Sequence, residues 1–147
     1  MRSLSGDGET WAVHCFDNTI WHWNQAGVGA QVSGLATKIA MRSTPDATCG
    51  DHLPFIIGTD GNIYMYSHAN GCTSGHYAFG SNGAGSDIST DFAVGTDGHL
   101  YKWSATTSVW SDYIASPFGT STMIGAWANG IFAMHTSSGA IQRISSL

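Results

Sequence analysis

The chain contains few charged residues, and this shortage limits the surfaces that it can present. Charged side chains make up 10% of its 147 residues, with five Lys or Arg against ten Asp or Glu. The basic residues are scattered singly, so they cannot form the basic stripe that displaces counterions from nucleic acids. The same scarcity disfavours an anionic membrane surface as a partner. We therefore expect no nucleic-acid partner.

Long apolar runs and helical patterns are also missing. No stretch approaches the ~20 residues of a transmembrane helix, so no membrane insertion is expected. The first residues, "MRSLSGDGETW", lack the apolar region of a signal peptide. By contrast, 19 Gly and 12% aromatic residues are typical of short strands joined by tight turns. Composition therefore predicts an all-β fold, and the length fits one domain, residues 1–147.

One pattern occurs four times along the chain: an aromatic-led strand, a polar turn, and a strand that usually carries an aliphatic-aromatic pair. The leading aromatic residues recur at intervals of roughly 40 residues. They are Trp11, Phe55, Phe92 and Phe132. The repeats span approximately 1–34, 35–83, 84–119 and 120–147. Such agreement predicts four copies of one hairpin module within the single domain.

The residues around each hairpin leave room for further strands. Asp60-Gly61 and Asp97-Gly98 suit type I′ turns, which need φ > 0 at both central residues. Strands are expected before and after the hairpins, at 37–41, 86–90 and 124–128 and at 30–34, 76–80 and 110–114. Four antiparallel strands in each repeat are the pattern of a β-propeller blade, although the last repeat lacks its fourth strand.

The residues "FAVGTDGHLYKW" (92–103) and the order of the first repeat resemble bacterial propeller lectins and tectonin repeats, respectively. This resemblance covers nearly the whole chain and implies a β-propeller that binds glycans, often on microbial surfaces, in or between blades. Those families have more blades than the four repeats present here. We expect a propeller of about four short four-stranded blades that closes within one chain, with "MRSL" completing the last blade. Completion by homo-oligomerisation of open chains is the alternative.

Alternation in the last strand of each hairpin separates two faces. Trp21, Tyr64 and Tyr101 are expected to pack between blades, whereas the second aromatic of each pair lies near the strand end and can reach solvent. Those second aromatics and their polar neighbours form the candidate glycan site: Trp23, Tyr66, Trp103, Asn24, Ser67, Ser104, His22 and His99. An aromatic ring beside polar groups, repeated in each blade, suits weak multivalent binding of sugars. The sequence therefore predicts a non-catalytic lectin; a propeller that binds proteins through the same aromatics is the alternative.

The chain has three cysteines, two of which suggest a pairing. Cys49 and Cys72 are equidistant from the turn at residues 60 and 61, so they face each other across the expected ladder and can form a disulfide after modest adjustment. A disulfide would favour an oxidising, extracellular compartment, although no signal peptide is visible. A pair of buried thiols is the alternative, and Cys15 is expected in the core.

No pattern that supports catalysis or metal binding stands out. The seven His show none of the paired spacings of zinc sites, and nothing resembles a nucleophile motif. Asp60 and Asp97 are explained by their turns, and one carboxylate per turn is too few for calcium. A glycosidase would need clustered carboxylates near the axis, where Asp7, Asp87 and Asp91 are the chief candidates. We therefore expect no enzyme activity, no metal and no cofactor.

Overall fold

All regular elements that can be described in this chain are β-strands. A computed structural model describes residues 3–6, 9–47, 49–68, 77–114, 121–127, 130–135 and 139–144. Its strands are β1 (Ser3–Gly6), β2 (Thr10–Val13), β3 (Thr19–Trp23), β4 (Gly29–Met41), β5 (Pro54–Gly58), β6 (Asn62–His68), β7 (Tyr77–Ser89), β8 (Phe92–Gly95), β9 (Leu100–Ser104), β10 (Val109–Ile114), β11 (Ser121–Trp127), β12 (Gly130–His135) and β13 (Ile141–Ile144). Within these ranges, no helix is long and apolar enough to cross a bilayer.

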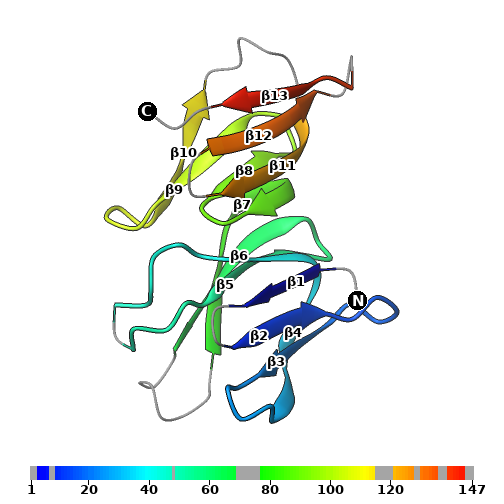
Figure 1. Cartoon of the computed structure of the whole chain (residues 1–147), viewed down its shortest axis with the longest axis vertical. Helices are drawn as coiled ribbons and strands as arrows, with labels where there is room; N and C mark the ends of the chain where they lie inside the picture. The colour runs from blue at the N-terminus through cyan, green and yellow to red at the C-terminus, as the bar shows by residue number, and fades with distance from the viewer. Residues whose placement is uncertain are drawn as a thin grey trace.

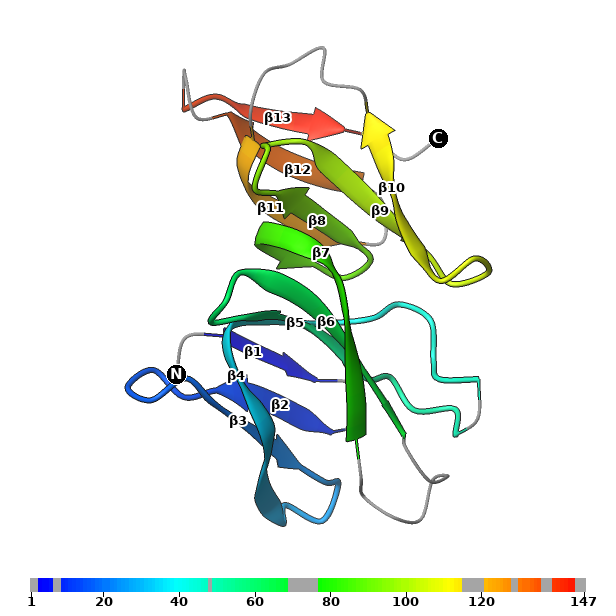
Figure 2. The ribbon, with the colours of Figure 1, turned by 180° about the vertical axis from the view of Figure 1, so that it is seen from behind.

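The strands follow one another in space in the order of the chain. β1 to β10 form one ten-stranded antiparallel sheet, and β11 to β13 form a separate three-stranded sheet. Figures 1 and 2 show the molecule from opposite sides, with β1–β4 at one end of its long axis and β11–β13 at the other. Neighbours in sequence therefore pair with each other, as expected for a chain of hairpins.

Two long strands divide the large sheet into parts. β4 and β7 contain 13 residues each. β4 pairs with β3 through residues 29–35 and with β5 through residues 36–41. β7 pairs with β6 up to residue 84 and with β8 from residue 85 onwards. We call the resulting parts section 1 (β1–β4), section 2 (β4–β7) and section 3 (β7–β10), and we call the three-stranded sheet section 4.

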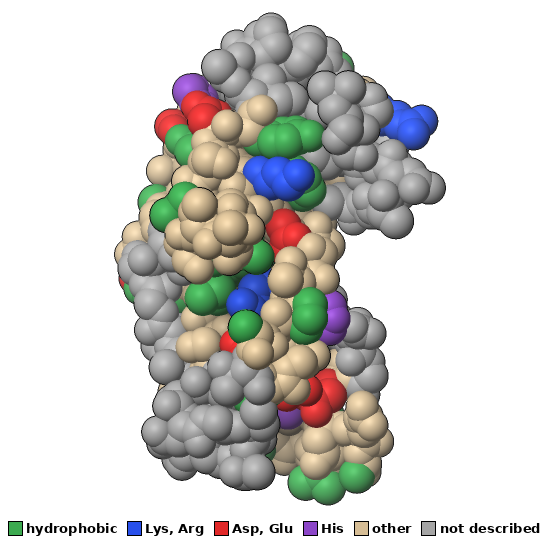
Figure 3. Space-filling view, turned by 90° about the vertical axis from the view of Figure 1, so that its left-hand side faces the viewer, with side chains coloured by type: hydrophobic (Ala, Val, Ile, Leu, Met, Phe, Trp, Pro, Cys, Tyr) green, Lys and Arg blue, Asp and Glu red, His purple; other side chains and the backbone are tan. Residues whose placement is uncertain are grey.

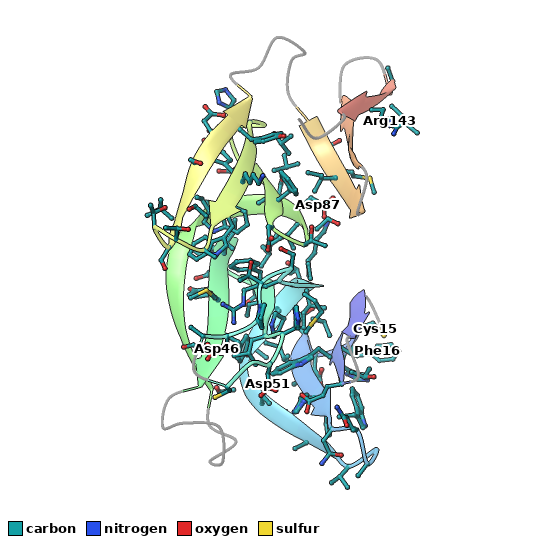
Figure 4. The ribbon with its side chains drawn as sticks, turned by 60° about the vertical axis from the view of Figure 1, so that its left-hand side comes forward. Cys15, Phe16, Asp46, Asp51, Asp87 and Arg143 are labelled. Carbon is teal, nitrogen blue, oxygen red and sulfur yellow. The ribbon has the colours of Figure 1, made fainter. Side chains whose placement is uncertain are left out.

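The expectation of a β-propeller with four closed blades is wrong, because the sheet is open. β1 pairs with β2, so the N-terminal residues do not supply a fourth strand to section 4. β1 and β10 are the free edges of the ten-stranded sheet. Continuous pairing through β4 and β7 joins the first three sections into one sheet instead of separate blades. Figure 4 shows sections 1 and 4 at the two ends of an open arrangement.

The expected hairpins are confirmed, and all of them have the same register. The leading aromatic lies opposite the residue five positions after the first residue of the turn, as Met65 is five positions after Asp60: Trp11↔His22, Phe55↔Met65, Phe92↔Lys102 and Phe132↔Arg143. Two residues closer to the turn, the opposed pairs are Val13↔Ile20, Ile57↔Ile63, Val94↔Leu100 and Met134↔Ile141. The four copies recognised in the sequence are thus equivalent in space at the level of the backbone.

The predicted type I′ turns are wrong. Gly61 and Gly98 have positive φ (81° and 82°), but Asp60 and Asp97 do not. The Gly61 N–H donates to the Gly58 carbonyl at 3.0 Å, so the turn contains Thr59 and Asp60 as its central residues and is followed by a left-handed glycine. This geometry is that of a three-residue loop with a bulge, which needs glycine at one position only.

The core lies between successive sections rather than in one centre. Trp11, Val13 and Ile20 of section 1 pack against Ile56 and Tyr66 of section 2. The opposite face of section 2 packs against section 3 in a second cluster, and the far face of section 3 packs against Ile124 of β11 in a third. Each section therefore uses both of its faces for burial, except at the two ends of the chain.

Candidate functional site

The turn between β5 and β6 holds a carboxylate against a tyrosine. Asp60 Oδ1 accepts a hydrogen bond from the Asn62 backbone N–H at 3.0 Å. Asp60 Oδ2 accepts from Asn62 Nδ2 at 2.9 Å and from the Tyr64 hydroxyl at 2.5 Å. Asp60 is exposed, whereas Tyr64 is half-buried. The turn therefore presents a carboxylate beside one accessible side of an aromatic ring.

The turn between β8 and β9 repeats this arrangement. Asp97 Oδ1 accepts from the His99 backbone N–H at 3.0 Å, and Oδ2 accepts from the Tyr101 hydroxyl at 2.7 Å. His99 Nδ1 lies 3.3 Å from Asp112 Oδ2, and its ring lies 6.5 Å from the Tyr101 ring in a stacked orientation. The same Asp–Tyr pair thus occurs at the same place in sections 2 and 3.

A glycine that precedes each turn makes room for this pair. A Cβ atom built on Gly58 would lie 2.5 Å from Asp60 Oδ1 and 2.8 Å from the Tyr64 ring. A Cβ atom on Gly95 would lie 2.7 Å from the Tyr101 ring and close to Asp97 Oδ1. Real Cβ atoms do not approach other atoms so closely. The carboxylate and the ring can therefore lie against the backbone only because glycine has no side chain there.

Each Asp–Tyr pair lines a pocket whose other wall comes from the preceding part of the sheet. In section 2, Gly34, Leu35 and Ile56 complete a pocket of about 280 Å³. The pocket in section 3 measures about 290 Å³ and is lined by Ile63, Gly83, Ala84, Gly95, Thr96, Asp97, Tyr101 and Trp110. We call these two cavities the turn pockets. Both combine apolar walls with a carboxylate and an exposed Thr hydroxyl, from Thr59 or Thr96.

The first hairpin has related chemistry but no preceding sheet. Asp17 Oδ1 accepts from His14 Nδ1 at 2.7 Å and from the backbone and side chain of Thr19 at 3.1 and 2.7 Å. Trp21 takes the position of the tyrosines and donates from Nε1 to Thr19 Oγ1 at 3.0 Å. Asn18 has φ 60°, a conformation that Asn tolerates better than most residues.

A third cavity, of about 230 Å³, lies on this part of section 1. Its lining residues are Ala12, Val13, His14, Trp21 and Trp23. The Trp21 and Trp23 rings are stacked with centroids 6.0 Å apart. This cavity is almost wholly apolar, so it differs chemically from the turn pockets.

The turn hydrogen bonds shift the proton affinities of the groups involved. Hydrogen bonds from Thr19 and His14 lower the pKa of Asp17 to about 2. The hydrogen bond from Tyr64 is the main cause of the lowered pKa of Asp60, and the bond from Tyr101 lowers the pKa of Asp97 in the same way. In return, the Asp97 carboxylate raises the pKa of Tyr101 to about 12. The carboxylates of all three turns therefore remain ionised well into acid pH.

Two of the three aromatic residues predicted to bind glycans are buried. Tyr66 has 0% of its surface exposed, and its hydroxyl donates to the Ser33 carbonyl. Trp103 is 6% exposed, with its ring centroid 5.2 Å from that of Phe55. Because these rings are covered by the preceding section, they offer no face to a ligand. Trp23 is half-buried and lines the apolar cavity of section 1.

The predicted polar partners mostly stabilise turns. Asn24 Oδ1 accepts from the Val28 N–H at 3.0 Å, and Ser104 Oγ accepts from the Thr107 N–H at 3.3 Å. Ser67 is half-buried on β6. Each of these residues follows one of the three predicted aromatics in sequence, but none of them lines a turn pocket.

The two predicted histidines have different surroundings. His22 Nε2 lies 2.7 Å from Glu9 Oε2, and its ring stacks on Trp11 with centroids 4.4 Å apart, so it belongs to the packing of section 1. His99 lies beside Tyr101 at the margin of the turn pocket of section 3. Of the eight residues predicted for the glycan site, His99 is the one that the structure brings next to a turn pocket.

The cysteine predictions have separate outcomes. Cys49 is disulfide-bonded. Its expected partner, Cys72, lies outside the described residues, so the Cys49–Cys72 pairing stays a prediction. Cys15 is a free thiol and is half-buried in the first turn, rather than buried in the core as expected. No cluster of three or more potential metal ligands occurs within the described part of the chain.

A repeated motif in the sequence marks the two turn pockets. Gly-Thr-Asp-Gly followed by two residues and Tyr occurs twice, at residues 58–64 and 95–101. Each Asp stabilises its turn through one carboxylate oxygen, and the other oxygen accepts from the Tyr hydroxyl. The spacing of four residues brings the Tyr hydroxyl back to the Asp carboxylate, which only the geometry reveals.

Charges of both signs are interspersed on the surface. On the face that Figure 3 shows, Lys and Arg side chains alternate with Asp and Glu, and hydrophobic side chains lie between them. The exposed large hydrophobic residues of the described chain include Phe16, Val28, Leu35, Val109, Met123 and Ile141.

Comparison with known proteins identifies the fold and not the activity. No family model matches the chain, and no curated protein matches it. The computationally designed Ika4 protein is similar in structure, with a TM-score of 0.60 at 13% identity over 98% of this chain and 89% of that chain. Human WBSCR16 is similar with a TM-score of 0.60 at 10% identity, over 93% of this chain and 44% of that chain. At these identities the similarity concerns the fold alone, and the tectonin resemblance stays a prediction.

Proposed function

We propose that the protein binds carbohydrate without catalysis, and that the turn pockets of sections 2 and 3 are its binding sites. The observation that carries this proposal is the repetition of one Asp–Tyr pocket, at Asp60–Tyr64 and Asp97–Tyr101. A pocket that occurs twice with the same chemistry suits a ligand that is itself repetitive, such as a glycan.

The chemistry of each pocket matches that of a sugar residue. The half-buried Tyr ring offers an apolar face to sugar C–H groups, and the carboxylate accepts hydrogen bonds from hydroxyls. Asp97 accepts two hydrogen bonds from the protein, so two of its roughly four acceptor positions remain for a ligand. The adjacent Thr96 hydroxyl can donate or accept. A few polar groups placed around an apolar wall are typical of small-molecule sites.

Two pockets on one chain also supply avidity. When both engage a surface that displays many copies of a glycan, the second binding event is intramolecular, and the apparent affinity rises by about 10²–10⁴. Weak individual pockets are therefore compatible with firm attachment to such a surface.

A glycan array tests this proposal directly. Wild-type protein should be retained on a subset of glycans, and the matching free monosaccharide should release it. Asp97→Ala or Asp60→Ala should lower retention by about 10²-fold, because one pocket alone lacks avidity. The variant with both changes should not be retained.

A matched control is Asp51→Ala, which removes an exposed carboxylate outside both pockets and should leave retention unchanged. Equal retention of the wild type and the double variant would contradict the proposed sites. Absence of any glycan binding, together with specific binding of a protein partner, would favour the alternative of a protein-interaction module, to which the exposed apolar cavity of section 1 lends support.

A further inference from the structure

The four hairpins share two kinds of face, and inside the chain these faces cover each other. We call the side that carries the leading aromatic residue the forward face, as with Trp11 and Phe55. The other side carries the aromatic pair of the second strand, such as Tyr64 and Tyr66, and we call it the rear face. Opposed residues of an antiparallel ladder lie on the same face, so the shared register defines both faces in every hairpin.

Each forward face packs on the next rear face in the same manner. The Trp11 ring of section 1 lies 5.4 Å from the Tyr66 ring of section 2. The Phe55 ring of section 2 lies 5.2 Å from the Trp103 ring of section 3. The forward face of section 3, with Val94, then packs against Ile124 of section 4. One interface therefore recurs along the chain, with the leading aromatic placed against the second aromatic of the next hairpin where both rings are described.

The rear face of section 1 has no section before it. Trp21 and Trp23 are half-buried and line an apolar cavity, whereas Tyr66 and Trp103, which are equivalent to Trp23, are buried at 0% and 6% exposure. Neither tryptophan belongs to any of the core clusters of the described residues. The Trp23 indole packs directly on the backbone of Gly29, where a Cβ atom would collide with it.

The forward face of section 4 has no section after it. Ile141 is 71% exposed and Met123 is 52% exposed, and both pair in register with Met134. Phe132 lies opposite Arg143, in the register position that Trp11 and Phe55 occupy. In Figure 4, Arg143 of section 4 and Phe16 of section 1 mark the two ends of the open arrangement.

We propose that a second copy of this chain occupies the rear face of section 1 through the forward face of its own section 4. The two uncovered faces are the two halves of the interface that the chain already forms internally, so each copy carries one half at each end. Among the residues that line the cavity at Trp21 and Trp23, His14 is the ionisable one, and it is paired with Asp17, so no charge of section 1 would be buried unpaired. Exposed apolar surface on both halves supplies the driving force.

This contact is head-to-tail, because different surfaces of the two copies meet. It also gives section 1 the wall that the turn pockets of sections 2 and 3 receive from the section before them. The proposal rests on packing alone and does not depend on carbohydrate binding, so the two can fail separately.

The test measures molecular mass in solution for the full chain and two variants. Light scattering after size exclusion should give the wild-type protein a mass of at least twice 15.5 kDa, the mass of one chain. Trp23→Asp, on one half of the interface, and Ile141→Asp, on the other, should each reduce the mass to 15.5 kDa. Because Ile141 is exposed, its replacement should leave folding, measured by circular dichroism, unchanged.

Mixing the two variants distinguishes the proposal from simple damage. Each variant keeps the half that the other has lost, so an equimolar mixture should regain a species of twice 15.5 kDa. Val109→Asp is the matched control, since Val109 is 51% exposed in section 3, away from both end faces, and its variant should keep the wild-type mass. A wild type that stays monomeric at high concentration, or a mixture that stays monomeric, would overturn the proposal.

Discussion

Asp97 and Tyr101 control each other's proton affinity, because the Tyr101 hydroxyl donates its hydrogen bond to the Asp97 carboxylate at 2.7 Å. The bond stabilises the charged form of the acid and the neutral form of the phenol, so the pKa of Asp97 falls while the pKa of Tyr101 rises to about 12. At the residue scale, each turn pocket is therefore a coupled pair, and substitution of one partner is expected to alter the other.

A pH titration tests this coupling. In the wild type, Tyr101 should ionise near pH 12, and Asp97→Asn should shift its ionisation towards the ordinary value of about 10. The raised pKa means that its contribution to folding stability is present below pH ~10 and is lost as the pH rises through about 12. Ultraviolet difference titration measures the shift, with Tyr101→Phe subtracted to identify the signal.

The control for this titration is Asp51→Asn, a change at a distant exposed carboxylate that should leave the Tyr101 signal in place. At acid pH the sign is reversed. The lowered pKa of Asp97 gives a stabilising contribution above pH ~4 that is lost as the pH falls. An Asp97→Asn variant whose Tyr101 still ionises near pH 12 would refute the coupling.

At the scale of the element, the hairpins of sections 2 and 3 each depend on two glycines with different roles. Gly98 follows the turn at φ 82°, a backbone conformation that residues with a side chain rarely adopt. It does not line the turn pocket. Gly95 precedes the turn, and its missing side chain leaves the space in which Asp97 and Tyr101 lie. One glycine therefore shapes the chain and the other shapes the pocket.

Alanine substitutions separate these two roles. Gly98→Ala should destabilise the protein by about 1–2 kcal/mol through the left-handed backbone. Gly95→Ala should cost about 1–3 kcal/mol, because the new methyl group must displace the Tyr101 ring. Denaturant midpoints provide the measurement.

Gly125→Ala serves as the reference substitution, because a Cβ atom there meets nothing within 4 Å and no positive φ is involved. Its stability should change by less than about 0.5 kcal/mol. If Gly95→Ala behaved like Gly125→Ala, the close approach of Tyr101 to the Gly95 backbone would be disproved.

At the scale of the whole molecule, one buried carboxylate connects three sections. Asp87 on β7 is 6% exposed. Its Oδ1 accepts from Lys38 Nζ of β4 at 2.5 Å, and its Oδ2 accepts from the backbone N–H of Ile124 in β11 at 2.8 Å. Figure 4 shows Asp87 between the ends of the open arrangement. Asp87 is one of the carboxylates that a glycosidase would need near the axis, but its contacts give it a structural role.

Asp87→Ala should loosen the packing of section 4 against the ten-stranded sheet. The substitution leaves the Ile124 N–H and the Lys38 ammonium without their acceptor, which should cost about 1–3 kcal/mol. Hydrogen exchange should rise first in β11, because that strand is not paired with the ten-stranded sheet.

Asp112→Asn is the comparison variant, since Asp112 is exposed on β10 and outside this network. It should leave both stability and exchange in β11 unchanged. In Asp87→Ala, exchange could instead rise equally in all strands, with no earlier change in β11. That result would show that Asp87 does not hold section 4 against the ten-stranded sheet.

Local chemistry was sufficient to predict the hairpins. Asp-Gly pairs, period-two alternation and repeated aromatics identify strands and turns within about ten residues, since these signals act through neighbouring backbone groups. They placed the faces correctly too, with Ile20 and Ile63 on one side and Trp21 and Tyr64 on the other. They did not predict the turn type, because the position of the left-handed residue depends on one hydrogen bond, from Gly61 to Gly58.

The sequence by itself determined the repeat, the strands and the register of the hairpins, all of which depend on contacts between nearby residues. The tertiary structure decided which aromatic rings are covered and whether the sheet closes. Tyr66 and Trp103 are buried because another section packs on them, while Trp23 has the same local pattern and no section before it. Burial is a property of the packed neighbour and not of the strand, so no pattern within one repeat could distinguish these residues.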